Sequence, residues 1–234
     1  MNQNLKIGVM ASKLGEARDR RQKNKKAKSK LKEKDTRRLI IEAAKRLFLQ
    51  MGFDKTTVAD IARELQMSPA NVYRYFAAKS EINEAVCMDL LGKIEAEAEK
   101  IAASRSTATQ RIRNLIEAVE KTYQKQYKFD RKLHDLIDAA ISENWAIIRR
   151  HNERMTAILE QIIASGMASG EFPQGDATLA TGLVYTACIR FRDPRLILEH
   201  EGEREPTLDQ MIDFCLAAIG GATILKFPSK EDRT

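Results

Sequence analysis

The sequence predicts an all-α protein with two domains. Apolar residues recur at helical spacing through most of the chain after residue 35, and no segment has a convincing strand pattern. A pair of short helices separated by a tight turn is predicted over residues 56–79, and longer helices follow it. A polar break over residues 104–109 lies near the predicted domain boundary. We therefore expect a small N-terminal helical domain and a larger C-terminal one.

Residues 56–79, TTVADIARELQMSPANVYRYFAAK, contain clear helix-start signals. Thr57 can cap the first helix, because its hydroxyl can accept a hydrogen bond from a free N–H of the opening turn. Ser68 and Pro69 begin the second helix with a capping hydroxyl and a ring whose fixed φ suits the first helical position. Val72 and Phe76 are four residues apart and so face inward together. We predict two helices joined by a turn at Gln66 and Met67.

The face opposite Val72 and Phe76 carries amide, guanidinium and phenol groups. Its centre is predicted to hold Ala70, Asn71 and Arg74, with Pro69, Tyr73 and Tyr75 on its flanks. Such a face on the second of two helices is typical of the recognition helix in a helix-turn-helix. A small helical bundle could contain the same helix start, with its aromatic residues in the core. The two-helix pattern alone does not separate these interpretations.

The surrounding residues favour the first interpretation. With the preceding helix and the helix start at Lys79, the unit closely resembles the N-terminal DNA-binding domain of TetR/AcrR-type transcriptional regulators. The resemblance covers about residues 34–94. The matching residues, in order and at the family's spacing, are Thr57, Ile61, Ala62, Ser68, Tyr73, Phe76 and Lys79. The family usually has glycine where Gln66 stands, at a turn position that favours positive φ, so the glutamine is expected to cost about 1 kcal/mol.

The resemblance also implies roles for individual residues. It assigns Tyr73 and Lys79 to DNA phosphates, and Thr57 to the same task from the start of its helix. Asn71 and Arg74 have side chains that can pair with the edges of adenine and guanine. We expect these two residues to select the DNA sequence.

The charge is concentrated at the N-terminus. The whole chain carries a net charge of +7, but residues 1–34 alone hold twelve Lys or Arg and three acidic residues. This segment has almost nothing to bury, so residues 1–33 are expected to form a disordered basic tail. The tail is either a flexible arm that contacts phosphates or a minor groove, or a solvated extension, which includes an upstream start codon assigned in error.

The first folded helix is predicted from about Asp35, as N-cap, to Met51, with Gly52 as a left-handed cap. Its apolar stripe should brace the two helices that follow. A long helix begins at Lys79 and links the domains, as the resemblance implies. We divide the chain into the tail, a DNA-binding domain over 34–94, an effector-binding and dimerisation domain over 95–226, and a frayed C-terminus over 227–234.

The C-terminal domain is predicted as a series of apolar helical stripes. Ile112 to Tyr123 mark the first, Leu133 to Ile148 the second, and Met155 to Ile163 the third. Asp176 or Thr178 opens the fourth, and Thr207 caps the last helix, which Gly220 ends.

Enzymatic and metal-binding functions are disfavoured. We find no phosphate-binding glycine loop after a strand, no nucleophile elbow and no HExxH sequence. The three cysteines and three histidines are scattered, so no metal, cofactor or disulfide framework is indicated. The absence of an apolar run of about 18 residues and of a signal peptide suggests a cytoplasmic protein without membrane contact.

We therefore expect a homodimeric transcriptional regulator, most plausibly a ligand-released repressor that binds a palindromic operator. The resemblance places the dimer on two helices at about 176–190 and 207–220. It also implies a pocket for an unknown small-molecule effector, with Tyr123, Trp145, Tyr185 and Phe191 as candidate lining, although such residues are more often simply part of the core. The alternative is a sequence-neutral basic architectural protein that binds DNA mainly through its tail.

Overall fold

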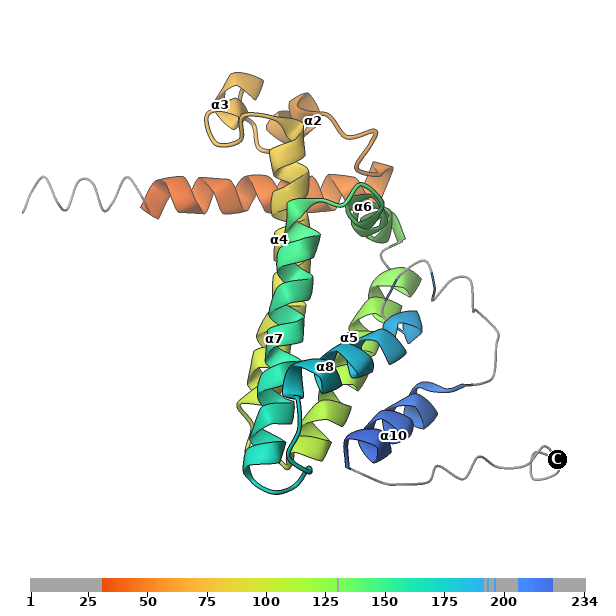
Figure 1. The fold of residues 1–234 in the computed structure, drawn as a ribbon. Coiled ribbons are helices and arrows are strands. Elements are labelled where there is room, and N and C mark those ends of the chain that lie inside the picture. Colours follow the sequence, from red (N-terminus) through yellow and green to blue (C-terminus); the bar gives the residue numbers. More distant parts are fainter. Residues whose placement is uncertain (1–30, 130, 192, 194–195, 197–205, 221–234) are drawn as a thin grey trace, which may run out of the picture.

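The computed structural model describes residues 31–129, 131–191, 193, 196 and 206–220. Every regular element within them is a helix, so the predicted all-α class is confirmed (Figure 1). No described helix is both long enough and apolar enough to cross a membrane. Residues 1–30 of the predicted tail and the predicted frayed end at 227–234 lie outside the described residues.

The N-terminal domain begins with a helix over residues 31–51, here called the first helix. The predicted start at Asp35 is wrong, since the chain is already helical at residue 31 and Asp35 lies inside the helix. Its C-terminal end is as predicted, because Gly52 adopts φ +90, which only glycine reaches without strain.

The buried stripe of the first helix holds two short helices in place. These are α2, Val58–Glu64, and α3, Pro69–Tyr73. The apolar side chains of the first helix that face them are Ile40, Ala43, Ala44, Leu47 and Phe48. They share one core with Ile61 of α2 and Val72 of α3, so the first helix braces the pair as predicted.

The long helix α4, Lys79–Ala102, connects the two domains. Its buried residues include Ile82 and Val86 near the N-terminal domain and Ile94 and Ala98 within the C-terminal body. It packs along α7, and the two helices run side by side down the long axis of the molecule (Figure 1).

The C-terminal body consists of helices α5, α6, α7, α8 and α10 with one short 3-10 turn. Their bounds are α5 Ala108–Phe129, α6 Arg131–Ser142, α7 Ala146–Ala168, α8 Ala177–Ala187, η1 Ile189–Phe191 and α10 Leu208–Ile219. The polar break before α5 is shorter than predicted, because Ala108 already belongs to the helix. Helix α7 packs against α4, α5 and α8 and so forms the centre of the body.

The predicted stripe from Leu133 to Ile148 is divided between two helices. Helix α6 ends at Ser142, and Asn144 adopts φ +52, the left-handed conformation that asparagine tolerates better than most residues. Trp145 is then the N-cap of α7. The apolar spacing continues across this corner, which is why periodicity alone missed it.

Side chains cap the ends of three helices in the body. Asp176 rather than Thr178 caps α8, its carboxylate accepting from the Leu179 N–H at 3.0 Å. Thr207 forms a reciprocal capping box at the start of α10. Glu171 accepts from the backbone N–H groups of Ala108 and Thr109 at 2.6 and 2.7 Å, so the loop after α7 caps the start of α5.

Candidate DNA-binding surface and internal cavity

The start of α2 is fixed by a reciprocal capping box. The Thr57 hydroxyl accepts from the Asp60 N–H at 3.1 Å, and Asp60 accepts from the Thr57 N–H at 3.0 Å. The Thr57 hydroxyl also donates to the Asp60 carboxylate at 2.6 Å, and this bond together with the one from the Thr57 N–H lowers the pKa of the Asp60 carboxyl. Thr57 is exposed at the end of α2, so it combines the predicted capping role with a surface position.

The turn between α2 and α3 has the backbone conformation that the sequence predicted. Gln66 adopts φ +53, where a residue with a Cβ is strained. Ser68 then caps α3 by accepting from the Asn71 N–H at 3.2 Å, and Pro69 occupies the first helical position. The predicted cap and proline start are confirmed.

Helix α3 is short and is anchored from behind. It ends at Tyr73, so Arg74 and Tyr75 lie in the turn that follows it rather than on a longer helix. Val72 and Phe76 are buried beneath it. The Arg37 guanidinium of the first helix lies over the Phe76 ring, 4.1 Å from its centroid, and donates to the Tyr75 carbonyl.

The outer face of α3 is open to solvent at the end of the molecule opposite α10 (Figure 1). Its exposed residues are Ser68, Pro69, Ala70, Tyr73 and Arg74, while Asn71, Tyr75 and Lys79 are half-buried. The Asn71 amide lies 3.7 Å from the Met67 sulfur, and Lys79 Nζ donates to the Asp54 carbonyl at 3.0 Å. This face thus presents amide, guanidinium, phenol and ammonium groups together.

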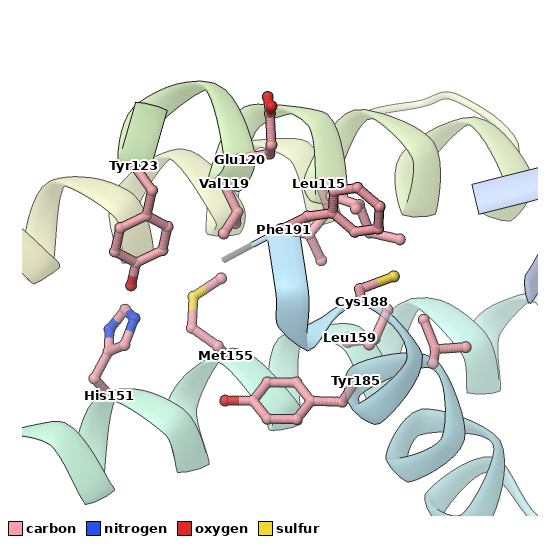
Figure 2. Close-up of a pocket in the computed structure, with 12 residues that line it drawn as sticks. Leu115, Val119, Glu120, Tyr123, His151, Met155, Leu159, Tyr185, Cys188 and Phe191 are labelled. Atoms are coloured by element: carbon pink, nitrogen blue, oxygen red, sulfur yellow. The ribbon is translucent and has the colours of Figure 1, made fainter. Parts of the chain in front are cut away.

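A cavity of about 50 Å³ lies between α5, α7, α8 and η1 (Figure 2). Its wall is mostly apolar, and the lining residues are Leu115, Ile116, Val119, Glu120, Tyr123, His151, Met155, Leu159, Val184, Tyr185, Cys188 and Phe191. Three of the four candidate pocket residues, Tyr123, Tyr185 and Phe191, are among them.

The fourth candidate, Trp145, is not among the residues that line this cavity. Trp145 sits at the corner between α6 and α7, where its indole N–H donates to Glu143 at 2.7 Å. The stripe prediction had placed Trp145 within a continuous helix. The break at Asn144 moves it to the helix end instead.

The cavity has a polar end that sequence reasoning missed. His151 is only 5% exposed, and its Nδ1 lies 2.7 Å from Glu95 Oε1 on α4. The Tyr123 hydroxyl points toward the His151 imidazole (Figure 2). The Tyr185 hydroxyl donates to Asn152 at 2.8 Å. His151 lies four residues before Met155 and eight before Leu159, so it shares their face of α7. Extending the apolar stripe back by one turn would therefore have indicated His151 from the sequence.

An uncharged apolar face on α8 is exposed. Leu179, Gly182, Leu183 and Thr186 are all exposed at one-face helical spacing, with Leu179 and Leu183 more than 60% accessible. A Cβ built on Gly182 would meet no atom of this chain within 4 Å.

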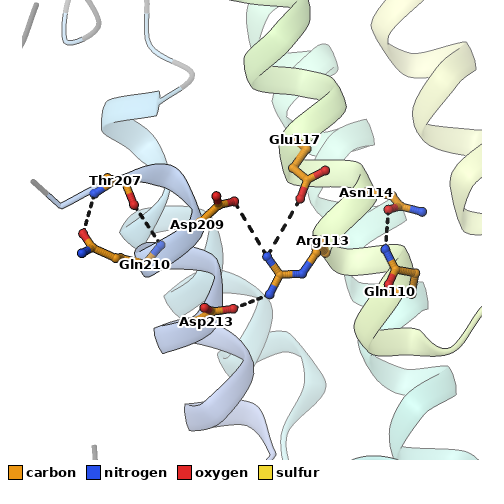
Figure 3. A network of polar contacts seen from close by, with 8 residues as sticks. All are labelled: Gln110, Arg113, Asn114, Glu117, Thr207, Asp209, Gln210 and Asp213. Carbon is orange, nitrogen blue, oxygen red and sulfur yellow. Dashed lines mark hydrogen bonds and ion pairs between the residues drawn. The ribbon is translucent and has the colours of Figure 1, made fainter. Parts of the chain in front are cut away.

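Ion pairs join helix α10 to α5. The Arg113 guanidinium of α5 pairs with Asp213 and lies 3.9 Å from Asp209, both on α10 (Figure 3). Helix α10, which packs against α8, carries a further exposed apolar residue, Phe214.

Comparison with known proteins identifies the architecture. Residues 40–86 match the family described as bacterial regulatory proteins, tetR family, and residues 108–211 match the tetracyclin repressor-like C-terminal domain. The HTH-type transcriptional regulator YhgD of Bacillus subtilis is 22% identical over 179 residues, which is 75% of this chain and 89% of YhgD.

Two solved structures illustrate the likeness in fold. A TetR/AcrR-family regulator from Thermobifida fusca matches with a TM-score of 0.58 at 21% identity, over 82% of this chain and 100% of the other. FadR of Bacillus subtilis, solved in complex with stearoyl-CoA, matches with a TM-score of 0.52 at 17% identity, over 78% and 96%. The two family matches fall on the N-terminal and C-terminal domains described above, in that order. The chain therefore belongs to the TetR family and is a DNA-binding transcriptional regulator, not an enzyme.

Proposed function

We propose that the protein is a homodimeric repressor that binds a palindromic operator and is released by a small-molecule effector. The observation that carries this proposal is the outer face of α3. Its polar groups lie on an element whose opposite side is fixed by Val72, Phe76 and Arg37, so a base-reading surface is held rigidly.

Asn71 and Arg74 are the proposed base-reading residues. An asparagine amide pairs with adenine and an arginine guanidinium with guanine in the major groove. The flanking residues Ser68, Pro69, Ala70 and Tyr75 shape this contact. Thr57, Tyr73 and Lys79 surround it and are proposed to bind phosphates, which position the protein without selecting a base.

The exposed face of α8, together with exposed Phe214 on α10, supports the dimer. Leu179 and Leu183 leave a contiguous apolar surface without charge, and Gly182 between them permits close approach of a second copy. Two copies related by a two-fold axis would present two α3 helices. A palindromic operator with half-sites about 34–36 Å apart, one turn of DNA, would then be read twice.

The size of the cavity supports a ligand-driven change of shape. An apolar cavity of about 150 Å³ binds benzene, whereas this one measures only about 50 Å³. An effector must therefore bind a conformation in which the lining helices have moved apart. FadR, with a related fold, is a regulator solved with an acyl-CoA. A ligand that prefers the widened state releases DNA if the operator prefers the closed one.

Helix α4 is the proposed link between cavity and DNA. Its residue Glu95 pairs with His151 of the cavity wall, and its first turns contribute Ile82 and Val86 to the DNA-binding core. Movement of α7 would thus tilt α4 and change the separation of the two recognition helices. The resulting coupling is expected at about 1–3 kcal/mol and to be reciprocal between ligand and operator.

The basic tail is proposed to bind additional DNA phosphates. Deleting residues 1–33 should flatten the slope of log affinity against log salt by about 0.9 for every phosphate that the tail neutralises. An unchanged slope would make the tail a solvated extension. The domain division at residues 94 and 95 likewise remains a proposal.

Selection of bound sequences from random duplex DNA, followed by affinity measurements on variants, tests the function. Asn71→Ala and Arg74→Ala should each cost about 1–3 kcal/mol and relax preference at one base position, whereas Lys79→Ala should weaken all duplexes alike. Enrichment of no sequence, with steep salt dependence, would instead establish a basic architectural protein. Unchanged affinity and preference in Asn71→Ala would refute the base-reading assignment.

A further inference from the structure

Two of the three cysteines meet where α8 and α10 pack together. Cys188 is the C-cap of α8, Cys215 lies on α10, and each is 4% exposed. Their side chains are hydrogen-bond partners. The bond from Cys188 lowers the pKa of the Cys215 thiol, and this effect outweighs burial, which acts in the opposite direction.

The cavity gives this pair a route to small solutes. Cys188 is one of the lining residues, and its side chain is visible in the cavity wall beside Phe191 (Figure 2). One water molecule needs about 10–15 Å³, and hydrogen peroxide is only slightly larger, so a cavity of about 50 Å³ admits it. Peroxide can therefore reach Cys188 from the cavity without unfolding of the body.

We propose that Cys188 and Cys215 form a peroxide-reactive dithiol that closes to an intramolecular disulfide. The proposal rests on the contact between the two side chains, the packing of their helices and the position of Cys188 in the cavity wall. It does not depend on DNA binding or on an effector.

The reaction uses one peroxide and two thiols. The lowered pKa favours loss of the proton from Cys215, which then accepts the hydrogen bond from Cys188. Transfer of that hydrogen-bonded proton from Cys188 to Cys215 places the thiolate on Cys188, the sulfur that lines the cavity. That thiolate attacks one peroxide oxygen, an S–O bond forms, the O–O bond breaks, and the departing hydroxide takes up a proton to leave as water. The Cys215 thiol, on losing its proton, attacks the Cys188 sulfenic sulfur. The S–S bond forms, the S–O bond breaks, and a second water leaves.

Cys87 provides an internal control. It is fully buried on α4, and burial together with the nearby Glu84 carboxylate raises its pKa to about 12. It does not line the cavity. Because each pKa unit changes the thiolate fraction about tenfold at a pH below the pKa, Cys87 should stay reduced under conditions that oxidise the pair.

The disulfide would have a structural consequence. It would tie the end of α8 covalently to α10 and draw the Cys188 sulfur away from the cavity wall. These are the helices that carry the exposed face with Leu179, Leu183 and Phe214. Oxidation would thus restrict relative motion of the two helices at that surface.

The test uses the full chain, treated with hydrogen peroxide and then denatured and alkylated. Before alkylation we expect an intact mass about 2 Da below that of the reduced chain. After alkylation we expect one modified cysteine, Cys87, and a linked peptide pair containing residues 188 and 215. Cys87→Ser should show the same loss of about 2 Da and the same linked peptides but no alkylated cysteine, whereas Cys188→Ser and Cys215→Ser should lose this mass shift. A chain denatured before peroxide treatment controls for reaction of unfolded protein.

Three outcomes would overturn the proposal. They are retention of all three thiols, oxidation of Cys188 to sulfinic acid without a link to Cys215, and a disulfide that includes Cys87 or joins two chains. Because the wild-type measurement alone separates these outcomes, a variant that fails to fold does not affect the test. Loss of operator binding would leave the result unchanged, so failure of the dithiol and failure of the proposed function are distinguishable.

Discussion

The Arg37 guanidinium covers the Phe76 ring at 4.1 Å and also donates to the Tyr75 carbonyl, so one side chain of the first helix holds the segment that follows α3. Stacking on the ring uses the face of the guanidinium, and the hydrogen bond uses its edge. These contacts make Arg37 a brace for the recognition helix.

Replacing Arg37 tests this bracing role. Arg37→Ala should lower the free energy of unfolding of the N-terminal domain by about 1 kcal/mol and weaken binding to every DNA sequence. Arg37→Lys keeps the charge but loses the planar stack, so it should behave almost as the alanine variant does. Thermal unfolding and DNA affinity provide the measurements, with exposed Arg38→Ala as the control. Full rescue by lysine would show that Arg37 acts through its charge.

Gln66 offers a stabilising substitution. Its φ of +53 strains a residue with a Cβ, so Gln66→Gly should raise the free energy of unfolding by about 0.5–1 kcal/mol after the added entropy of the unfolded chain is counted. Asn144→Gly, at φ +52, should gain less because asparagine tolerates this conformation. Urea unfolding curves would compare the two. Equal gains, or a loss at Gln66, would contradict the strain argument.

Glu171 introduces a pH dependence. Burial opposes its charged form, but the hydrogen bonds from Thr109 and Ala108 are stronger in sum and lower its pKa below the usual 4.5. A carboxyl with a depressed folded pKa stabilises the fold fully above its unfolded pKa, and this stabilisation is lost as the pH falls through the folded value. Glu171→Gln should therefore cost about 1 kcal/mol at pH 7 and progressively less below pH 4.5.

Melting temperatures of Glu171→Gln and wild type at several pH values provide the measurement. Glu153→Gln, on the exposed surface of α7, is the matched control and should leave the melting temperature nearly unchanged throughout. A difference between wild type and Glu171→Gln that persists undiminished well below pH 4.5 would exclude the carboxylate as its source.

Leu183→Glu probes the proposed dimer. Leu183 is 63% exposed in the single chain, so a glutamate there should not disturb the fold, but it would bury an unpaired charge between two copies. We expect the dimer dissociation constant to rise by at least about tenfold, with operator affinity falling in parallel. Met88→Glu changes a 50% exposed apolar residue on α4 in the same way and should remain dimeric. Sedimentation of both variants would measure their oligomeric state. A Leu183→Glu variant that remains dimeric would place the interface elsewhere.

Local rules made the helix starts and the turn of the N-terminal domain predictable. The caps at Thr57 and Ser68, the proline start and the positive φ of Gln66 all depend on neighbours within a few residues, which the sequence displays directly. The predicted start of the first helix, Asp35, lies several residues after the observed one. Aspartate is a common N-cap, but here the backbone is already helical from residue 31.

The cavity was predictable only in part, because it depends on distant packing. Its polar end pairs Glu95 with His151 across 56 positions of sequence, and no periodicity signals such a partner. Tyr123, Tyr185 and Phe191, named from the sequence as candidate lining, do line this cavity. Trp145 was misplaced because a left-handed Asn144 interrupts a stripe whose spacing continues unbroken.

The position of Trp145 determines what optical measurements on this protein can report. As the chain's only tryptophan, it supplies most of the intrinsic emission, and its indole is bonded to Glu143 at the α6–α7 corner. An effector that enters the cavity would therefore change this signal only if the corner itself moves. A flat emission titration would not count against binding, whereas a spectral shift would mark rearrangement of α6 relative to α7. Heat release or equilibrium dialysis would measure occupancy, and the tryptophan would then record the conformational step separately.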